Sequence, residues 1–279
     1  MFKRRFIQAD VFSSVPARGN GLAVVVDADG LSDDNMQNFA AWTNLAETTF
    51  LLPPTDPAAD YRVRIFTPGR EMPFAGHPTL GSCAAWLHCG GVAKDAARVI
   101  QECGVGLVEI DLSGPVPAFV APPTTIKPLP EADITRLASA LNLARAIVIN
   151  GIELSNGPVW QVLELADANA VLAVDSSRVS WPDFVGLSLI GAHPADSGFD
   201  FEVRMISPSS GMSEDPITGS LNAAIAHSLM AEGHLTRPLV MRQGTCIGRE
   251  GRVFIMPDQN DRILIGGAVQ ILIDGWLTL

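Results

Sequence analysis

An approximate internal repeat at half the length of the chain restricts the folds that this sequence can adopt. The segment RIFTP at Arg64–Pro68 recurs as RMISP at Arg204–Pro208, an offset of 140 residues. The pattern P-x-x-G-S at 78–82 recurs at 216–220, an offset of 138, and GNGLAVV is loosely matched by SNGPVWQV about 136 residues later. Ordered and nearly constant offsets indicate a duplicated unit. The alternative is coincidence among common turn and cap residues.

Each copy of the repeat reads as a strand, a loop and a helix with proline at its first position, where the missing N–H is not needed. The helical segments TLGSCAAWLHC and TGSLNAAIAHSLM are apolar or small almost all round. Such helices are buried in a core, and Gly90, Gly91 and Gly233 are their expected C-terminal caps. The sequence therefore predicts an α+β fold of two pseudo-repeated domains, each a curved layer of strands around a buried helix.

A cluster of six prolines between Pro115 and Pro130 marks the expected domain boundary. We therefore predict an N-terminal domain at 1–120 and a C-terminal domain at 121–266. Near the start of the chain, Ser32 is a predicted N-cap for a helix over Asp33–Trp42. The segments GLAVVVDAD, TTFLLPP, YRVRIFTP and DFEVRMISP have the composition or alternation of strands.

Composition excludes several classes of function. The chain has 279 residues, 47% of them hydrophobic, and a net charge of −11. An acidic chain without a basic stripe is a poor partner for nucleic acid or for anionic membranes. The N-terminal segment has no apolar core of a secretory signal, and the four cysteines have no C-x-x-C spacing. We expect a cytoplasmic protein with reduced thiols, and an anionic substrate would need backbone amides or a few arginines.

Three residues are candidates for acid–base chemistry. His77 precedes a predicted helix and has a side chain that transfers protons at neutral pH, although a helix-capping histidine is the alternative. Asp215 precedes Pro216, and because aspartate is a favoured N-cap residue, capping is the stronger interpretation, although one residue could serve both roles. Glu47 lies where a strand begins, so it is either an exposed residue at the strand edge or a partly buried general base.

Other chemistries have weaker support in the sequence. Ser220 invites comparison with a hydrolase triad, but no G-x-S-x-G turn is present and Ser220 would lie within a helix. The five histidines have no metal-binding spacing such as H-E-x-x-H. The segment at Gly19–Gly21 is no dinucleotide fingerprint. The residues therefore favour neither a metal site nor a dinucleotide cofactor.

The motifs taken together resemble those of the PhzF family of phenazine-biosynthesis isomerases, within the diaminopimelate epimerase-like superfamily. The matching segments run in order along the chain and include DVFSSVPARGNGLAVV, ETTFLLPP, RIFTPGREMPFAGHPTLGS, SEDPITGS and GGAVQILIDGWLTL. The resemblance implies two barrel domains, each around a central helix, with the active site in the cleft between them. It also implies that the last strand, about 267–279, returns to the first domain.

The resemblance further implies cofactor-free proton transfer on a small anionic metabolite by a homodimer. By motif match Glu47 moves the proton, and His77 and Asp215 complete the catalytic group. The implied substrate contacts are Asn20, Gly76, Thr79, Gly219 and Ser220. The two loops that carry catalytic cysteines in racemases have none here, which argues against two-thiol epimerisation. The family usually has G-N-P where this chain has Gly19-Asn20-Gly21.

These features predict a cofactor-independent isomerase that moves a proton on an unsaturated carboxylate. Two alternatives stay open at this point. One is a racemase or epimerase that uses carboxylate bases, and the other is a protein that binds a small molecule without catalysis.

Overall fold

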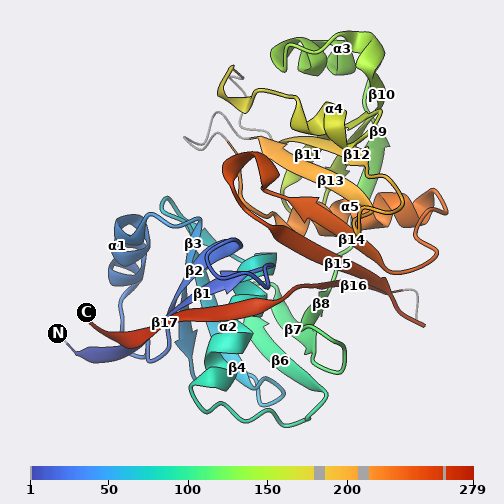
Figure 1. The fold of residues 1–279 in the computed structure, drawn as a ribbon. Coiled ribbons are helices and arrows are strands. Elements are labelled where there is room, and N and C mark those ends of the chain that lie inside the picture. The colour runs from blue at the N-terminus through green and yellow to red at the C-terminus, as the bar shows by residue number, and fades with distance from the viewer. Residues whose placement is uncertain (1, 179–185, 207–213, 260–261) are drawn as a thin grey trace. The chain divides into compact units, whose positions relative to one another are not determined.

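The computed structural model describes residues 2–178, 186–206, 214–259 and 262–279. Ser207 and Pro208 at the end of RMISP, and Ser213 of SEDPITGS, lie outside the described residues. The chain divides into two compact units, one formed by Met1–Val120 with Gly266–Leu279 and the other by Ala121–Ile265 (Figure 1). No helix in the described part of the chain is long and apolar enough to cross a membrane.

The first unit consists mainly of strands. Its elements are β1 (Lys3–Val11), β2 (Asn20–Val25), α1 (Asp33–Thr43), β3 (Glu47–Leu52), β4 (Tyr61–Phe66), β5 (Glu71–Met72), α2 (Gly76–His88), β6 (Arg98–Cys103), β7 (Gly106–Asp111), β8 (Ala118–Val120) and β17 (Val269–Thr278). The last strand, β17, pairs antiparallel with the first, β1, so the two ends of the chain lie side by side (Figure 1).

The second unit repeats this composition. Its elements are β9 (Thr125–Pro128), α3 (Glu131–Ala140), a 3₁₀ turn (Arg145–Ile147), β10 (Val148–Ser155), β11 (Val159–Leu165), α4 (Ala168–Leu172), a 3₁₀ turn (Ser176–Arg178), β12 (Gly186–Ala192), β13 (Phe201–Ile206), α5 (Gly219–Ala231), β14 (Leu239–Gln243), a 3₁₀ turn (Thr245–Ile247), β15 (Gly251–Pro257) and β16 (Ile263–Gly266).

Strand pairing follows the same order in both units. In the first, β1–β2 is antiparallel, β2–β3 parallel, β3–β4 antiparallel, β4–β6 parallel and β6–β7 antiparallel. In the second, the same sequence of pairings joins β10 to β11, β12, β13, β14 and β15 in turn. The first parallel connection contains α1 or α4, and the second contains α2 or α5. This shared connectivity is the structural form of the duplication.

The helices α2 and α5 are the buried helices that the sequence predicts. Both have 13 residues, nine of them buried, with small or apolar side chains on every face. Close packing explains Gly81, because a Cβ there would lie 2.5 Å from Leu22 Cδ2. Both helices end before a glycine with positive φ, Gly90 at 96° and Gly233 at 75°, as expected for C-terminal caps.

The helix α1 covers the outer side of the first unit, where Met36 and Ala40 pack on Phe50 and Phe66. Ser32 begins the helix as predicted, since its hydroxyl accepts a hydrogen bond from the Asn35 N–H at 3.2 Å. We expect Ser32→Ala to lower the free energy of unfolding by about 1 kcal/mol, because this N–H then loses its partner. Urea denaturation would measure the change, with exposed Ser14→Ala as the control. An equal effect of the two substitutions would contradict the capping role.

The sequence alignment of the two copies is wrong in the loop before the buried helix. Ile65 pairs with Met72 in the first unit, and Met205 makes the equivalent bridge to Asp215 in the second. The offset is therefore 140 residues in the strand but 143 after the loop, where the second copy is three residues longer. In this register α2 and α5 begin at equivalent residues, Gly76 and Gly219.

This register also corrects the predicted position of the prolines. Pro78 is the third residue of α2, whereas Pro216 lies three residues before α5. Neither is the first residue of a helix. The structural counterpart of His77 is therefore Ser220, and the counterpart of Asp215 is Met72. The histidine and the aspartate are not two versions of one position.

Candidate active site

Three of the predicted site residues meet in the first unit. Asn20 is the first residue of β2 and Glu47 the first of β3, and these neighbouring strands run parallel, with Leu22 opposite Glu47. Their N-terminal ends therefore lie at the same edge of the sheet. His77, in the first turn of α2, has Nε2 3.3 Å from Glu47 Oε2 and Nδ1 3.4 Å from Asn20 Nδ2. The fold thus brings together an amide, an imidazole and a carboxylate.

Burial defines the chemistry of this group. The side chains of His77 and Glu47 are 6% and 17% exposed, and Asn20 is also buried. Glu47 is therefore not an exposed residue at a strand edge. His77 does not cap its helix either, because the N-cap is Ala75 and has no side-chain hydrogen bond. The two structural alternatives, an exposed glutamate at a strand edge and a helix-capping histidine, are therefore wrong, and the catalytic roles of both residues stay predictions.

The protonation of His77 follows from its surroundings. Burial lowers the pKa of His77 to about 3, so the imidazole is neutral at neutral pH. An amide Nδ2 can only donate, so Nδ1 is the acceptor and the ring proton lies on Nε2. This N–H lies near the Glu47 carboxylate, and the 3.3 Å contact does not have the geometry of a hydrogen bond. The arrangement suits a glutamate that accepts a proton from a substrate.

A pH titration of stability tests this assignment. The native pKa of His77, about 3, is below the unfolded value of about 6.5, so the unfolded chain binds more protons between these values. Stability from a neutral His77 is therefore complete above pH 6.5 and is lost as the pH falls toward 3. We expect wild type to lose up to about 1.36 kcal/mol per pH unit relative to His77→Gln between pH 6 and 5. If the urea midpoints of the two proteins change by the same amount with pH, the assignment of a neutral His77 is wrong.

The other two predicted residues of this unit lie in the first turn of α2. Gly76 is its first residue. Thr79 is fully buried, and its hydroxyl donates to the Ala75 carbonyl at 2.9 Å and accepts from Gln101 Nε2 at 3.1 Å. Thr79 therefore uses its hydroxyl within the unit. Its predicted contact with a substrate stays a prediction, as does that of Gly76.

Asp215 belongs to the second unit and is also buried. Its backbone N–H donates to the Met205 carbonyl at 2.9 Å, and its carboxylate accepts a hydrogen bond from the Thr218 hydroxyl. The N-cap of α5 is Thr218, so the capping interpretation of Asp215 is wrong. Gly219 and Ser220 are the first two residues of α5, and their roles as substrate contacts stay predictions.

Gln243 of β14 supports this turn from the neighbouring strand. Its Oε1 accepts from the Thr218 N–H at 3.0 Å and from Asn222 Nδ2 at 2.9 Å. Its Nε2 donates to the Thr218 hydroxyl at 3.0 Å and to the Asp215 carbonyl at 3.3 Å. The turn from Asp215 to Thr218, which leads into α5, is therefore fixed by side-chain hydrogen bonds from Gln243. The sequence analysis did not identify Gln243.

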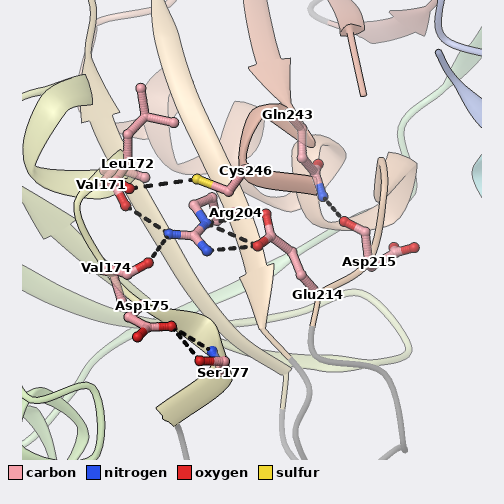
Figure 2. A network of polar contacts seen from close by, with 10 residues as sticks. All are labelled: Val171, Leu172, Val174, Asp175, Ser177, Arg204, Glu214, Asp215, Gln243 and Cys246. Atoms are coloured by element: carbon pink, nitrogen blue, oxygen red, sulfur yellow. Dashed lines mark hydrogen bonds and ion pairs between the residues drawn. The ribbon is translucent and has the colours of Figure 1, made fainter. Parts of the chain in front are cut away.

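A buried ion pair lies directly before Asp215, and the sequence analysis missed it as well (Figure 2). Arg204 of β13 bonds Glu214 through Nη2 at 2.7 Å and through Nε at 3.1 Å, and both residues are almost inaccessible to solvent. Its Nη1 donates to the carbonyls of Val171 and Val174 at 3.0 and 2.6 Å. We call this pair with its two carbonyl contacts the Arg204–Glu214 clamp. The sequence did contain a signal for this ion pair, because Arg204 lies in the repeated segment RMISP and Glu214 in the matched segment SEDPITGS.

The first unit has the same contact in an exposed form. Arg64, the counterpart of Arg204, bonds Glu71 through Nε and Nη2, both at 2.7 Å, and its Nη1 bonds Asp33 at 2.6 Å. Glu71 precedes α2 by five residues, as Glu214 precedes α5. In each unit, an arginine at the same strand position therefore forms an ion pair with a glutamate five residues before the buried helix.

Within the described residues, no group of three or more His, Cys, Asp or Glu side chains is arranged to hold a metal ion. The four cysteines are free thiols.

Comparison with known proteins defines the class to which this fold and site belong. The chain has the fold of a Bacillus anthracis phenazine biosynthesis protein of the PhzF family, with a TM-score of 0.84 over 100% of both chains at 23% identity. The expected fold of two strand barrels around central helices is thereby confirmed. At 23% and 12% identity, these two solved structures show the fold alone.

The family itself follows from the sequence. Residues 9–275 match the family described as phenazine biosynthesis-like protein, PhzC-PhzF, and the chain belongs to it. Antisense-enhancing sequence 1 of Schizosaccharomyces pombe is 35% identical and covers 99% of each chain. Trans-2,3-dihydro-3-hydroxyanthranilate isomerase of Pseudomonas fluorescens is 33% identical and covers 89% of this chain and 88% of its own. The expected membership of an isomerase family is confirmed.

Proposed function

We propose that this protein is an isomerase that moves a proton on a small unsaturated carboxylate without a cofactor. The main support is the contact of Glu47 with the neutral His77, 3.3 Å apart and both largely buried. A carboxylate in such a place is a general base with little competition from water. The proposal includes the cytoplasmic location expected from the sequence.

The proposed reaction conserves atoms and electrons. The Glu47 carboxylate takes a proton from a carbon next to the double bond of the substrate, and the electron pair shifts along the unsaturated system. The resulting carboxylic acid then returns the proton to another carbon, so the double bond moves and Glu47 is regenerated. His77, held by Asn20, keeps the carboxylate in place. Asp215 is proposed as a second group that transfers or orients a proton.

A protein with a net charge of −11 needs local positive potential to bind an anionic substrate. The helices α2 and α5 each begin with a glycine, where the backbone N–H groups of the first turn have no partner within the helix. Such N–H groups and the helix dipole favour anions. We propose that the N–H groups at the start of α2, the helix that carries His77, bind the substrate carboxylate and the charge that develops during proton transfer.

The experiment uses trans-2,3-dihydro-3-hydroxyanthranilate, the compound named in the Pseudomonas relatives, as the probe. Incubation in D₂O followed by NMR reports both a shifted double bond and the carbon that gains deuterium. Isomerisation with deuterium at one defined carbon supports the proposal. Deuterium incorporation with racemisation and an unmoved double bond would favour an epimerase. Binding that raises the melting temperature without any exchange would favour a binding protein.

A further inference from the structure

A cavity of the first unit lies at the opposite end of the barrel from Glu47 and His77. Its volume is about 790 Å³, which is within the range of small-molecule sites. It is formed mainly by the segments that follow β2 and β3 and by the last residues of α2. Glu47 and His77 lie instead at the start of β3 and of α2, and the 13 residues of α2 span about 20 Å. The cavity is therefore separate from the candidate active site.

The second unit shows that the fold does not require this opening. At the equivalent end of its barrel the cavity has a volume of only about 60 Å³. The lining of this smaller cavity includes Phe201 and Leu229. They are the counterparts of Tyr61 and Trp86, which line the larger one, at the offsets of 140 residues in the strand and 143 in the helix. The larger space is therefore a property of the residues of the first unit and not of the shared strand order.

One wall of the cavity is apolar and held in place by its own packing. The Trp86 ring stacks on Tyr61, with 5.2 Å between the ring centroids and 24° between their planes. Gly91 also packs on this ring, because a Cβ built on it would lie 2.3 Å from Trp86 Cδ2. Leu51 and Pro53 extend the apolar surface. Such a wall can bind an apolar group without the cost of first ordering its side chains.

Arg4 of β1 brings a positive charge to this lining, although its side chain is only 7% exposed. Its Nη1 donates to the carbonyls of Asp27 and Asp29, the second at 2.9 Å. Its Nε is enclosed without a partner, whereas Nη2 is not enclosed and makes no hydrogen bond to the described residues. Buried polar groups nearly always have partners, and a guanidinium binds anionic oxygens most strongly. Nη2 therefore marks a position for a carboxylate oxygen.

Negative groups lie beside this arginine. Asp27 and Asp29, whose carbonyls hold Arg4 Nη1, are both exposed and both line the cavity. The end of α2 at Cys89 also lines it and carries the negative end of the helix dipole. Asp60, the third acid of the lining, already accepts two backbone N–H groups, at 2.9 and 2.7 Å. A partner for an ammonium group therefore lies next to a partner for a carboxylate.

We propose that this cavity binds an α-amino acid with an apolar side chain. The carboxylate of the ligand bonds Arg4 Nη2, its ammonium group faces Asp27 and Asp29, and its side chain packs on Trp86. In an α-amino acid both charged groups are attached to one carbon, which matches the adjacency of the arginine and the two aspartates. A simple carboxylic acid would bring an unpaired negative charge to the aspartates, and a simple amine would leave Arg4 without an acceptor. The site does not depend on the proposed function.

Calorimetric titration of the full chain tests the class of ligand. The probes are L-phenylalanine, L-leucine, L-phenylalaninamide, which lacks the carboxylate, and 3-phenylpropanoate, which lacks the ammonium group. Relative to L-phenylalanine, loss of the carboxylate should raise Kd by about tenfold or more, because a charge-assisted hydrogen bond is lost. Loss of the ammonium group should raise Kd by about fivefold or less, because its partners are exposed. No saturation by either amino acid at millimolar concentration, or equal affinity for L-phenylalanine and both analogues, would overturn the proposal.

Two substitutions and a local signal test the place of binding. Arg4→Met should weaken the binding of L-phenylalanine by about tenfold or more. Asp29→Asn changes an exposed residue and should narrow the difference between L-phenylalanine and 3-phenylpropanoate, whereas Asp196→Asn, an exposed aspartate of the second unit, should not. In protein labelled with 5-fluorotryptophan, L-phenylalanine should shift the ¹⁹F resonance of Trp86 and leave that of Trp160 in place.

The outcome is informative even if Arg4→Met does not fold, because the Asp29 variant and the Trp86 resonance are measured without it. An unshifted Trp86 resonance at saturation, or an Asp29 variant with the same selectivity as the Asp196 variant, would overturn the site. Glu47→Gln should bind L-phenylalanine with wild-type affinity. Loss of binding in that variant would place the amino acid in the candidate active site instead and would also overturn the proposal.

Discussion

Glu47→Gln is expected to retain the fold and lose most of the isomerisation rate. Glutamine has nearly the shape of glutamate, and it keeps an oxygen near His77 Nε2, 3.3 Å away in the native protein. It cannot take a proton from carbon. A positioned general base typically contributes about 10²–10⁴ in rate, so kcat should fall by this factor. The measurement is the rate of double-bond movement in the probe, with deuterium uptake as a second signal.

The control for this substitution is Glu153→Gln, which removes the same charge from a partly exposed residue of β10. It should leave the rate unchanged. Circular dichroism and the urea midpoint show whether the Glu47 variant is folded. A folded Glu47→Gln with wild-type turnover would exclude Glu47 as the base. If the wild-type protein does not convert the probe, Glu47 has to be tested by deuterium exchange into other small unsaturated carboxylates.

The candidate site shows which part of the chemistry was accessible from the sequence. Glu47 and His77 are 30 residues apart, and no local pattern joins them. The motif resemblance selected both, and the packing of α2 against the neighbouring strands β2 and β3 then explains their proximity. Local propensity suggested instead that His77 and Asp215 were caps. That interpretation failed because Ala75 and Thr218 hold the cap positions, and cap positions depend on loop geometry that residue type alone does not determine.

The repeat shows a second limit. The strands were aligned correctly by RIFTP and RMISP, since Tyr61–Phe66 and Phe201–Ile206 differ by 140. The P-x-x-G-S pattern then gave a false register, because a three-residue longer loop separates strand and helix in the second copy. The structure restores the register through backbone pairing at Met72 and Asp215. A short motif of turn residues cannot reveal an insertion, whereas a ladder of hydrogen bonds can.

The Arg204–Glu214 clamp should be the most sensitive ion pair described in the second unit. We expect Arg204→Met to lower the free energy of unfolding by about 3–5 kcal/mol, because Glu214 would remain buried without its cation. The carbonyls of Val171 and Val174 would also lose their donor. The matched control is Arg145→Met, since Arg145 bonds Glu131 with similar geometry, at 2.7 and 2.8 Å, on the surface. Its loss should cost about 0–1 kcal/mol.

Urea denaturation of the two variants measures the difference, and a double substitution separates its causes. Replacing both members of a buried pair by apolar residues of similar size is often neutral or stabilising. Arg204→Met with Glu214→Leu should therefore recover most of the stability that Arg204→Met loses. Equal effects of Arg204→Met and Arg145→Met would show that the clamp contributes no more than a surface pair.

Activity of the same double variant shows what the clamp does beyond stability. The backbone of Asp215 is hydrogen-bonded to Met205 and Gln243. The preceding residue, Glu214, is fixed by its ion pair with Arg204. If the clamp orients Asp215 for proton transfer, the stable double variant should have a reduced kcat with an unchanged KM for the probe. If it serves folding alone, kcat should return together with stability. A reduced kcat in a double variant of normal stability would mean that the Arg204–Glu214 ion pair serves to position Asp215 and not to stabilise the fold.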